Sequence, residues 1–149
     1  MSAPARGLMV AAPQSGSGKT VVTLALMRAL ARCGLDIRAA KAGPDFIDPG
    51  FHALASGWPS VNLDPWSMAP ARLRALAGRQ GGSHLIVEAM MGLFDGAADG
   101  SGSAADLAVI LGIPAVLVVD VARQSQSVAA LVRGFRDHRP ELALAGVIL

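Results

Sequence analysis

The sequence is poor in cysteine and histidine. Its single cysteine, Cys33, excludes a disulfide framework and a cysteine metal cluster, and it fits a reducing compartment. Cys33 lies in a stretch of helical pattern, where we expect a small buried side chain. His52, His84 and His138 do not have the spacing of metal ligands, so the sequence does not predict a structural zinc site.

The sequence also lacks a strong charge imbalance and a long hydrophobic run. Thirteen Lys and Arg against eleven Asp and Glu leave a net charge of only +2, which does not indicate nucleic-acid binding. No apolar run reaches the ~18 residues of a membrane span. The start, MSAPARGLMVAA, is typical of a strand entering a Gly-rich loop and not of a cleavable signal. We therefore expect a soluble, cytoplasmic protein.

Apolar segments alternate with segments of helical periodicity. Strands are expected at 7–12, 36–41, 84–89, 115–120 and 143–149, and helices at 19–33, 70–79, 104–111 and 125–137. Parallel strands need helical crossovers that bury both faces of their sheet, which explains strands that are almost entirely apolar. The predicted fold class is α/β, a single parallel-sheet domain over residues 1–149 with helices on both faces.

The segments between these elements carry further expectations. Residues 42–50, AGPDFIDPG, contain two prolines and two glycines, so we predict an ordered loop without regular structure. Ser127 is expected to cap a helix, and Trp66 to be partly exposed beside polar loop residues. The sequence ends in an apolar segment at Leu149, whereas chain termini usually lie at exposed ends, so we expect a truncated part of a longer protein.

Residues 13–20, PQSGSGKT, nearly match the phosphate-binding pattern GxxxxGK[ST]. They stand between an expected strand and an expected helix, where backbone N–H groups, a lysine and a helix N-terminus can converge on a polyphosphate. Pro13 occupies the first glycine position and cannot donate an N–H. An ordinary Ser/Gly turn that caps a helix is the alternative. We predict that the ATP phosphates contact Gln14, Ser15, Gly16, Ser17, Gly18, Lys19 and Thr20.

A second polar cluster lies in residues 41–52, KAGPDFIDPGFH. Its two prolines stiffen the loop and can hold Asp45 and Asp48 in fixed directions, as magnesium (Mg2+) or a hydrogen-bonding substrate requires. Lys41 and His52 flank the loop. A solvated turn explains the same residues equally well, and the residue pattern alone leaves both interpretations open.

Three carboxylates lie at or after the ends of expected strands. Glu88 ends an apolar strand at the edge where open α/β sheets bind ligands, so a role toward Mg2+ or a nucleophile is expected. Asp95 lies in the Gly-rich loop 90–103, which could close over the site or form a simple Asp-Gly turn. Asp120 ends another buried strand, and a helix cap is its alternative role.

The motif set resembles the amino-terminal domain of the cobyrinic (or hydrogenobyrinic) acid a,c-diamide synthase family. The motifs that carry this resemblance are APQSGSGKT, KAGPDFIDPGFH, NLDPW, EAMMGLFDG, GSAADLA, LVVDVARQSQSVAALVRGF and GVIL. They occur in the family's order and span almost all 149 residues. The resemblance implies a P-loop NTPase fold similar to dethiobiotin synthetase.

The resemblance also implies a glutamine-dependent amidotransferase of cobalamin biosynthesis. Such an enzyme uses ATP to convert the a and c acetate carboxylates of a corrinoid, cobyrinic or hydrogenobyrinic acid, into amides through acyl phosphates. By the same resemblance Thr20, Asp48 and Glu88 would hold Mg2+. Lys19 would stabilise the transferring phosphoryl group, and Lys41, Asp45 and Asp95 would serve the substrate or the intermediate.

Two features depart from the whole enzyme of that family. The carboxy-terminal glutaminase domain and its cysteine nucleophile have no counterpart in residues 1–149, so we expect that this segment cannot make its own ammonia from glutamine and is inactive in isolation. The family's last strand continues into an asparagine that resembles an adenine-reading residue, which leaves nucleotide affinity open. A dethiobiotin synthetase-like ligase and a ParA/MinD-like ATPase switch are the alternatives, although Gln14 replaces the second lysine of the switch proteins.

Overall fold

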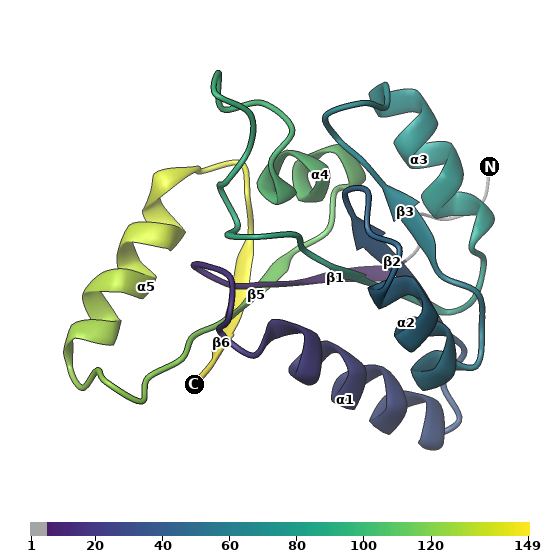
Figure 1. The fold of residues 1–149 in the computed structure, drawn as a ribbon, viewed down its shortest axis with the longest axis horizontal. Coiled ribbons are helices and arrows are strands. Elements are labelled where there is room, and N and C mark those ends of the chain that lie inside the picture. The colour runs from purple at the N-terminus through teal and green to yellow at the C-terminus, as the bar shows by residue number, and fades with distance from the viewer. Residues whose placement is uncertain (1–5) are drawn as a thin grey trace.

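The computed structural model describes residues 6–149 and contains a six-stranded sheet with helices on both faces (Figure 1). The strands are β1 (Arg6–Ala11), β2 (Ile37–Ala42), β3 (Val61–Leu63), β4 (His84–Glu88), β5 (Ala115–Val118) and β6 (Leu144–Ile148). The helices are α1 (Lys19–Arg32), α2 (Asp48–Ser56), α3 (Pro70–Arg79), α4 (Ala104–Leu111) and α5 (Ser127–His138).

The strand order is β3-β2-β4-β1-β5-β6, and every neighbouring pair is parallel. This arrangement confirms the predicted α/β class. β1 lies between β4 and β5, and β4 lies between β2 and β1, so the two strands that precede the Gly-rich loops are adjacent at the centre of the sheet.

Two apolar layers separate the sheet from its helices. On one face Val10, Ile37 and Ile86 pack with Met27 of α1 and with α2. On the other face Met9 and Val87 belong to a larger cluster that includes α3 and α4, with α5 at its edge. Figure 1 shows α1 and α2 below the sheet and α3 and α4 above it. Because consecutive strand residues point to opposite faces, the apolar strands supply both layers.

The helices that follow the two central strands, β1 and β4, lie on opposite faces of the sheet. The segment after β1 leads into α1 on one face, whereas the segment after the adjacent β4 leads into α4 on the opposite face. The two connections therefore diverge at the carboxyl edge of the sheet, which is the usual ligand position in open α/β folds. The phosphate-loop motif and the end of β4 both lie there.

The prediction that residues 42–50 lack regular structure is wrong at both ends of this range, because Ala42 is the last residue of β2 and residues 48–50 belong to α2. Asp48 begins α2, and Pro49 occupies its first turn. Proline is tolerated there because the first N–H groups of a helix have no acceptor within the helix. Gly50 follows within the same turn. A Pro-Gly pair was therefore a helix start and not a break.

Three further expectations need correction, and a fourth is confirmed. β3 adds a sixth strand, which the sequence pattern missed because only three residues, Val61–Leu63, form it. Cys33 is exposed and not buried, since it follows the last turn of α1. Ser127 is the first residue of α5 and makes no capping hydrogen bond. Trp66 is 71% exposed, as expected.

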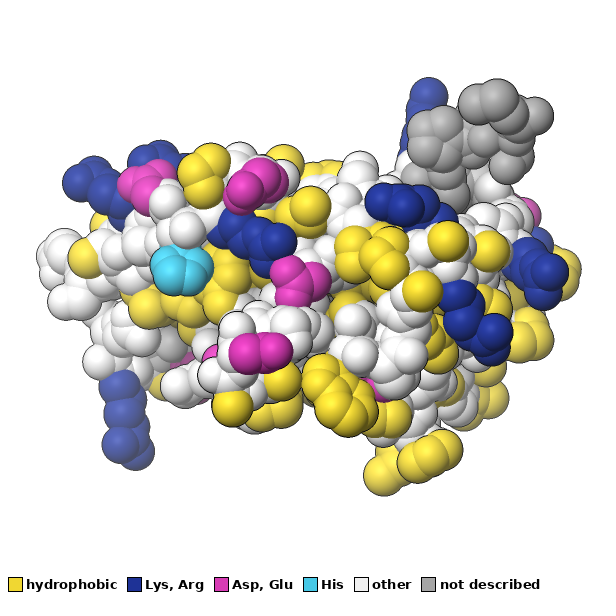
Figure 2. All heavy atoms as spheres, turned by 90° about the horizontal axis from the view of Figure 1, so that it is seen from above, with side chains coloured by type: hydrophobic (Ala, Val, Ile, Leu, Met, Phe, Trp, Pro, Cys, Tyr) yellow, Lys and Arg dark blue, Asp and Glu magenta, His cyan; other side chains and the backbone are white. Residues whose placement is uncertain are grey.

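The surface over α3, α4 and the neighbouring loop is chemically mixed. Figure 2 shows scattered basic side chains with acidic and hydrophobic groups between them on this face. Among the described residues, no helix is both long and apolar enough to cross a membrane.

Candidate active site

The phosphate-loop motif forms an open turn between β1 and α1. Gly16 and Gly18 have φ angles of 83° and 82°, a backbone conformation that L residues with a side chain rarely adopt. A Cβ built on either glycine would meet no atom within 4 Å, so the space outside the loop is free. Ser17 is buried and donates a hydrogen bond to the Gln14 carbonyl at 3.1 Å, which fixes the turn.

The N-terminus of α1 is open to an anion. Gly18 is its N-cap and offers no side-chain acceptor to the first N–H groups of the helix. Lys19 and Thr20 follow as the first two helical residues, so their side chains leave the helix at its positive end. A groove continues from this loop, lined by Gly16, Ser17, Gly18, Val22, Val118, Val119, Asp120, Val121, Ala122, Ile148 and Leu149.

Glu88 lies at the centre of a buried polar cluster beneath the loop. Its side chain is fully buried, and its Oε1 accepts hydrogen bonds from Thr20 Oγ1 at 2.6 Å and from Lys41 Nζ at 3.0 Å. Lys19 Nζ lies 3.8 Å from the same oxygen. The sequence predicted functional roles for all four residues, and the fold brings their polar groups together.

The sheet itself explains why Lys41 meets Glu88. The two residues are partners in the register between β2 and β4. Ala39 and Ile86, two residues earlier on the same strands, belong to the apolar layer under α1 and α2. On this face of the sheet, the side chains of β2 and β4 are therefore apolar in the middle of the strands and charged at the carboxyl ends, where Lys41 meets Glu88.

Hydrogen bonds keep Glu88 ionised despite its burial. Burial alone would raise the pKa of Glu88, but hydrogen bonds from His52 and Thr20, with the charge and hydrogen bond of Lys41, lower it to about 2. Without these donors a fully buried carboxyl group would favour its neutral form. The cluster therefore maintains a carboxylate where a cation can use it.

The two lysines have opposite pKa shifts. Burial lowers the pKa of Lys19, and the neighbouring charge of Lys41 lowers it further, while Glu88 acts in the opposite direction. Burial also lowers the pKa of Lys41, but its hydrogen bonds to Asp48 and Glu88 outweigh this and raise it above the ordinary value. Lys41 is thus held in its charged form by two carboxylates. Of the two lysines, Lys19 has the weaker contacts with protein carboxylates.

The loop before α2 and the first residue of α2 direct two further carboxylates at Lys41. Asp48 Oδ2 lies 2.5 Å from Lys41 Nζ, and Asp45 Oδ2 lies 3.8 Å from it. Burial would raise the pKa of Asp45, but backbone N–H groups of Asp48 and Ile47 hydrogen bond to its Oδ1 and lower it. The solvated-turn alternative does not describe these two side chains, because both face Lys41.

Asn62 clamps this loop, a role that the sequence pattern did not reveal. Its Nδ2 donates to the carbonyls of Gly43 at 2.9 Å and Asp45 at 2.7 Å. Asn62 lies in β3, the strand that was not predicted, so its proximity to residues 43–45 could not be foreseen.

His52 was named with this loop but was given no role. It is fully buried in α2, and its Nε2 lies 2.7 Å from Glu88 Oε2, while its Nδ1 lies 3.2 Å from Ser60 Oγ. The spacing of four residues from Asp48 would have placed both side chains on one helix face. The sequence pattern does not reveal this relation, because the expected loop over residues 42–50 includes Asp48.

Asp95 and Asp120 lie apart from the hydrogen bonds of Glu88. Asp95 Oδ2 accepts a hydrogen bond from the backbone N–H of Gly92 at 2.9 Å, within the loop that follows β4. Gly92 also lies close to the carbonyl of Pro13, so this loop adjoins the start of the phosphate loop. Asp120 Oδ1 accepts from Ala122 N at 2.8 Å and lines the groove beside the glycines.

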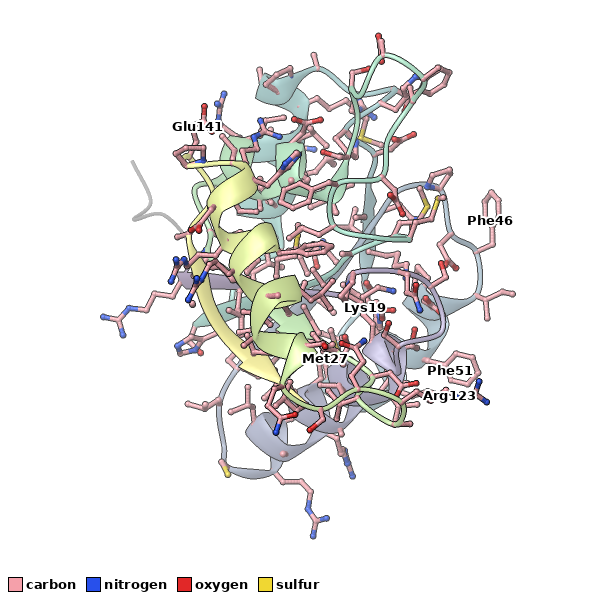
Figure 3. The ribbon with its side chains drawn as sticks, turned by 90° about the vertical axis from the view of Figure 1, so that its left-hand side faces the viewer. Lys19, Met27, Phe46, Phe51, Arg123 and Glu141 are labelled. Carbon is pink, nitrogen blue, oxygen red and sulfur yellow. The ribbon has the colours of Figure 1, made fainter. Side chains whose placement is uncertain are left out.

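The side chains at the carboxyl edge of the sheet differ sharply in exposure. In Figure 3, Lys19 lies at the start of α1, whereas Phe46 projects outward from the loop before α2. Phe46 is 96% exposed. Glu88, Lys41 and His52 are therefore the buried part of the polar cluster, while the loop that supplies Asp45 carries a large exposed apolar side chain.

The oxygen donors of the cluster suit a magnesium ion. Three carboxylates, those of Asp45, Asp48 and Glu88, face two ammonium groups, so the cluster has one negative charge in excess. Within the described chain, no three His, Cys, Asp or Glu side chains alone could hold a metal. A hard cation here would therefore need the Thr20 hydroxyl and ligand oxygens as well, which is the usual way in which Mg2+ is bound beside phosphates.

Comparison with known protein families identifies the family of this chain. Residues 8–149 match the model of the CobQ/CobB/MinD/ParA nucleotide binding domain. The chain belongs to this family. As a member of the CobQ/CobB/MinD/ParA family it has a nucleotide-binding domain, in agreement with the open loop at the start of α1.

Individual curated proteins are similar to this chain over almost its whole length. The chain is 63% identical over 145 residues to a protein of Rhizobium meliloti (strain 1021) named hydrogenobyrinate a,c-diamide synthase. It is 57% identical over 147 residues to a protein of the same name from Brucella anthropi. The alignments cover 96% and 97% of this chain and 34% of each relative, so the chain spans about a third of their length. The family resemblance drawn from the motifs is confirmed.

Proposed function

We propose that this chain binds ATP with Mg2+ and is the synthetase part of a hydrogenobyrinate a,c-diamide synthase of cobalamin biosynthesis. The observation that carries the proposal is the convergence of Lys19, Thr20 and Lys41 on the buried carboxylate of Glu88, directly beneath an open phosphate loop. The names of the similar proteins support the choice of a corrinoid substrate.

The phosphate loop would hold the triphosphate. The backbone from Gln14 to Thr20 presents amide groups, and Lys19 adds a cation whose lowered pKa reflects burial next to Lys41. Phosphate oxygens would compensate that unfavourable environment better than the 3.8 Å contact with Glu88 does. The groove between Gly16 and Asp120 offers space for the nucleoside.

Thr20, Asp48 and Glu88 would hold Mg2+. When bound, the ion supplies a positive charge that neutralises the phosphates and orients them for transfer. Lys41 touches both carboxylates, so it holds them in place before nucleotide binds. The carboxylates would therefore need little rearrangement when the nucleotide binds, and a site with fixed polar groups stabilises a charged transition state more strongly.

The proposed reaction proceeds through an acyl phosphate. A carboxylate oxygen of the corrinoid attacks the γ-phosphorus of ATP and ADP leaves; ammonia then attacks the acyl carbon, phosphate leaves and the nitrogen loses a proton. Lys19 stabilises the transferring phosphoryl group, and Lys41, Asp45 and Asp95 are assigned to the substrate side. The ammonia would come from glutamine through a domain outside this chain, so the chain alone would not use glutamine.

The two alternative functions have less support. A ParA/MinD-like switch uses a second lysine early in its loop, and this chain has Gln14 there. A dethiobiotin synthetase-like ligase would share the loop and the lysine, but the similar proteins carry the name of a corrinoid synthase. We therefore favour the amidotransferase.

The test uses the full-length protein that carries this chain. It is incubated with ATP, Mg2+ and ammonium chloride, and with hydrogenobyrinate, cobyrinate or a dethiobiotin precursor in parallel. We expect the mass spectrum to show replacement of two carboxyl groups of hydrogenobyrinate by amides, with ADP as co-product and no reaction in the Lys19→Ala control. Consumption of the dethiobiotin precursor with both corrinoids unchanged would overturn the proposal.

A further inference from the structure

α2 contributes two side chains to the buried cluster, from one helix face. Asp48 is its first residue and His52 follows four residues later, so both side chains project in the same direction. Asp48 contacts Lys41, and His52 contacts Glu88. The His52 side chain is fully buried against the central carboxylate.

The two oxygens of Glu88 have different partners. Oε1 receives the hydrogen bonds of Thr20 and Lys41, whereas Oε2 lies 2.7 Å from His52 Nε2. An ionised carboxylate can only accept hydrogen bonds, so Nε2 must carry the proton and donate it. His52 therefore holds one oxygen of Glu88 and leaves the other on the side of the phosphate loop.

Ser60 completes the orientation of the imidazole. Its Oγ lies 3.2 Å from His52 Nδ1. With the proton on Nε2, a neutral imidazole has a free lone pair on Nδ1, and the Ser60 hydroxyl can donate to it. A hydrogen bond at the second ring nitrogen fixes both tautomer and ring orientation, as outer partners do in metal sites.

We propose that His52 is a positioning residue: it anchors Oε2 of Glu88 so that Oε1 stays directed at Thr20 and at the magnesium ion of the bound nucleotide. The assignment rests on the proposed function, since it concerns the same site. Without His52, this buried oxygen loses its 2.7 Å donor, and the carboxylate turns toward its remaining donors.

The test measures how strongly Mg2+ tightens nucleotide binding. A non-hydrolysable ATP analogue with a β,γ-imido bridge is titrated calorimetrically into the full-length protein, once with Mg2+ and once with EDTA. His52→Leu removes the donor, and His52→Gln restores an N–H that can reach Glu88. We expect His52→Leu to lose about 10- to 100-fold of the Mg2+-dependent tightening, because loss of an outer partner typically weakens metal binding by this factor. Affinity in EDTA should stay unchanged, and His52→Gln should retain most of the tightening.

A second pair of variants covers the case in which His52→Leu does not fold. His52→Asn is polar but too short to reach Glu88, so it should lose the Mg2+ effect that His52→Gln retains. Equal tightening by Mg2+ in the wild type and in every variant overturns the assignment. An equal loss with Mg2+ and with EDTA, without rescue by glutamine, also overturns it, because that result indicates general structural damage. A wild-type protein that binds no nucleotide under either condition overturns the proposed function itself.

Discussion

Replacing Glu88 by glutamine should remove a large, pH-dependent part of the stability of this domain. The ionised carboxylate is held by His52, Thr20 and Lys41, and its pKa is lowered from 4.5 to about 2. Each pKa unit corresponds to about 1.4 kcal/mol, so the ionised form contributes roughly 3 kcal/mol to the free energy of unfolding. Because the folded pKa is the lower one, this contribution is present above about pH 4.5 and is lost as the pH falls toward 2.

Urea unfolding followed by circular dichroism at pH 7, 5 and 3 measures this contribution. Glu88→Gln keeps the size of the side chain and one carbonyl oxygen, but it removes the charge. We expect it to cost roughly 3 kcal/mol at pH 7, and the difference from wild type should shrink at pH 3. Glu141→Gln is the control, since the Glu141 side chain is 67% exposed and should matter by less than about 0.5 kcal/mol. A penalty for Glu88→Gln that is the same at pH 7 and pH 3 would refute the reasoning.

Three further changes test other parts of the structure. Lys19→Ala should raise the Kd for ATP by roughly 30-fold or more, because loss of a buried cation from an anion costs about 2–5 kcal/mol; calorimetry with an unchanged Kd would exclude the loop's role. Gly92→Ala should lower the free energy of unfolding by about 1–3 kcal/mol, because the alanine Cβ would lie 2.6 Å from the Pro13 carbonyl oxygen. Gly78→Ala is the control: its Cβ would meet no atom within 4 Å, so this change should be neutral or stabilising. Leu73→Ala should cost about 2–5 kcal/mol in chemical denaturation because Leu73 is fully buried in α3; a cost no larger than that of truncating Leu54, which is 77% exposed, would contradict the described core.

Local patterns predicted the elements that carry the phosphate loop. β1, the loop and α1 were recognised because an apolar strand, a Gly-rich turn and a helical repeat follow one another without interruption. α2 was missed because Pro49 and Gly50 resemble helix breakers when they stand next to a loop. In the fold they occupy the first turn of a helix, where a missing N–H has no cost.

The contacts of the candidate site could be predicted only in part. Glu88 and Lys41 were each expected to matter, but their pairing depends on the register between β2 and β4, which no local pattern contains. The roles of His52 and Asn62 depend on α2 and β3, the two elements that the pattern did not reveal. The register between distant strands and the presence of short elements therefore could not be predicted from local sequence patterns.

The most direct test of the account is a crystal structure of the protein with an imido analogue of ATP and Mg2+. We predict that the β- and γ-phosphates lie against the amides of residues 14–20 and the ammonium group of Lys19, with the metal ion between Thr20 and Glu88. A triphosphate bound elsewhere on the molecule, or a metal ion that contacts neither Thr20 nor Glu88, would contradict it.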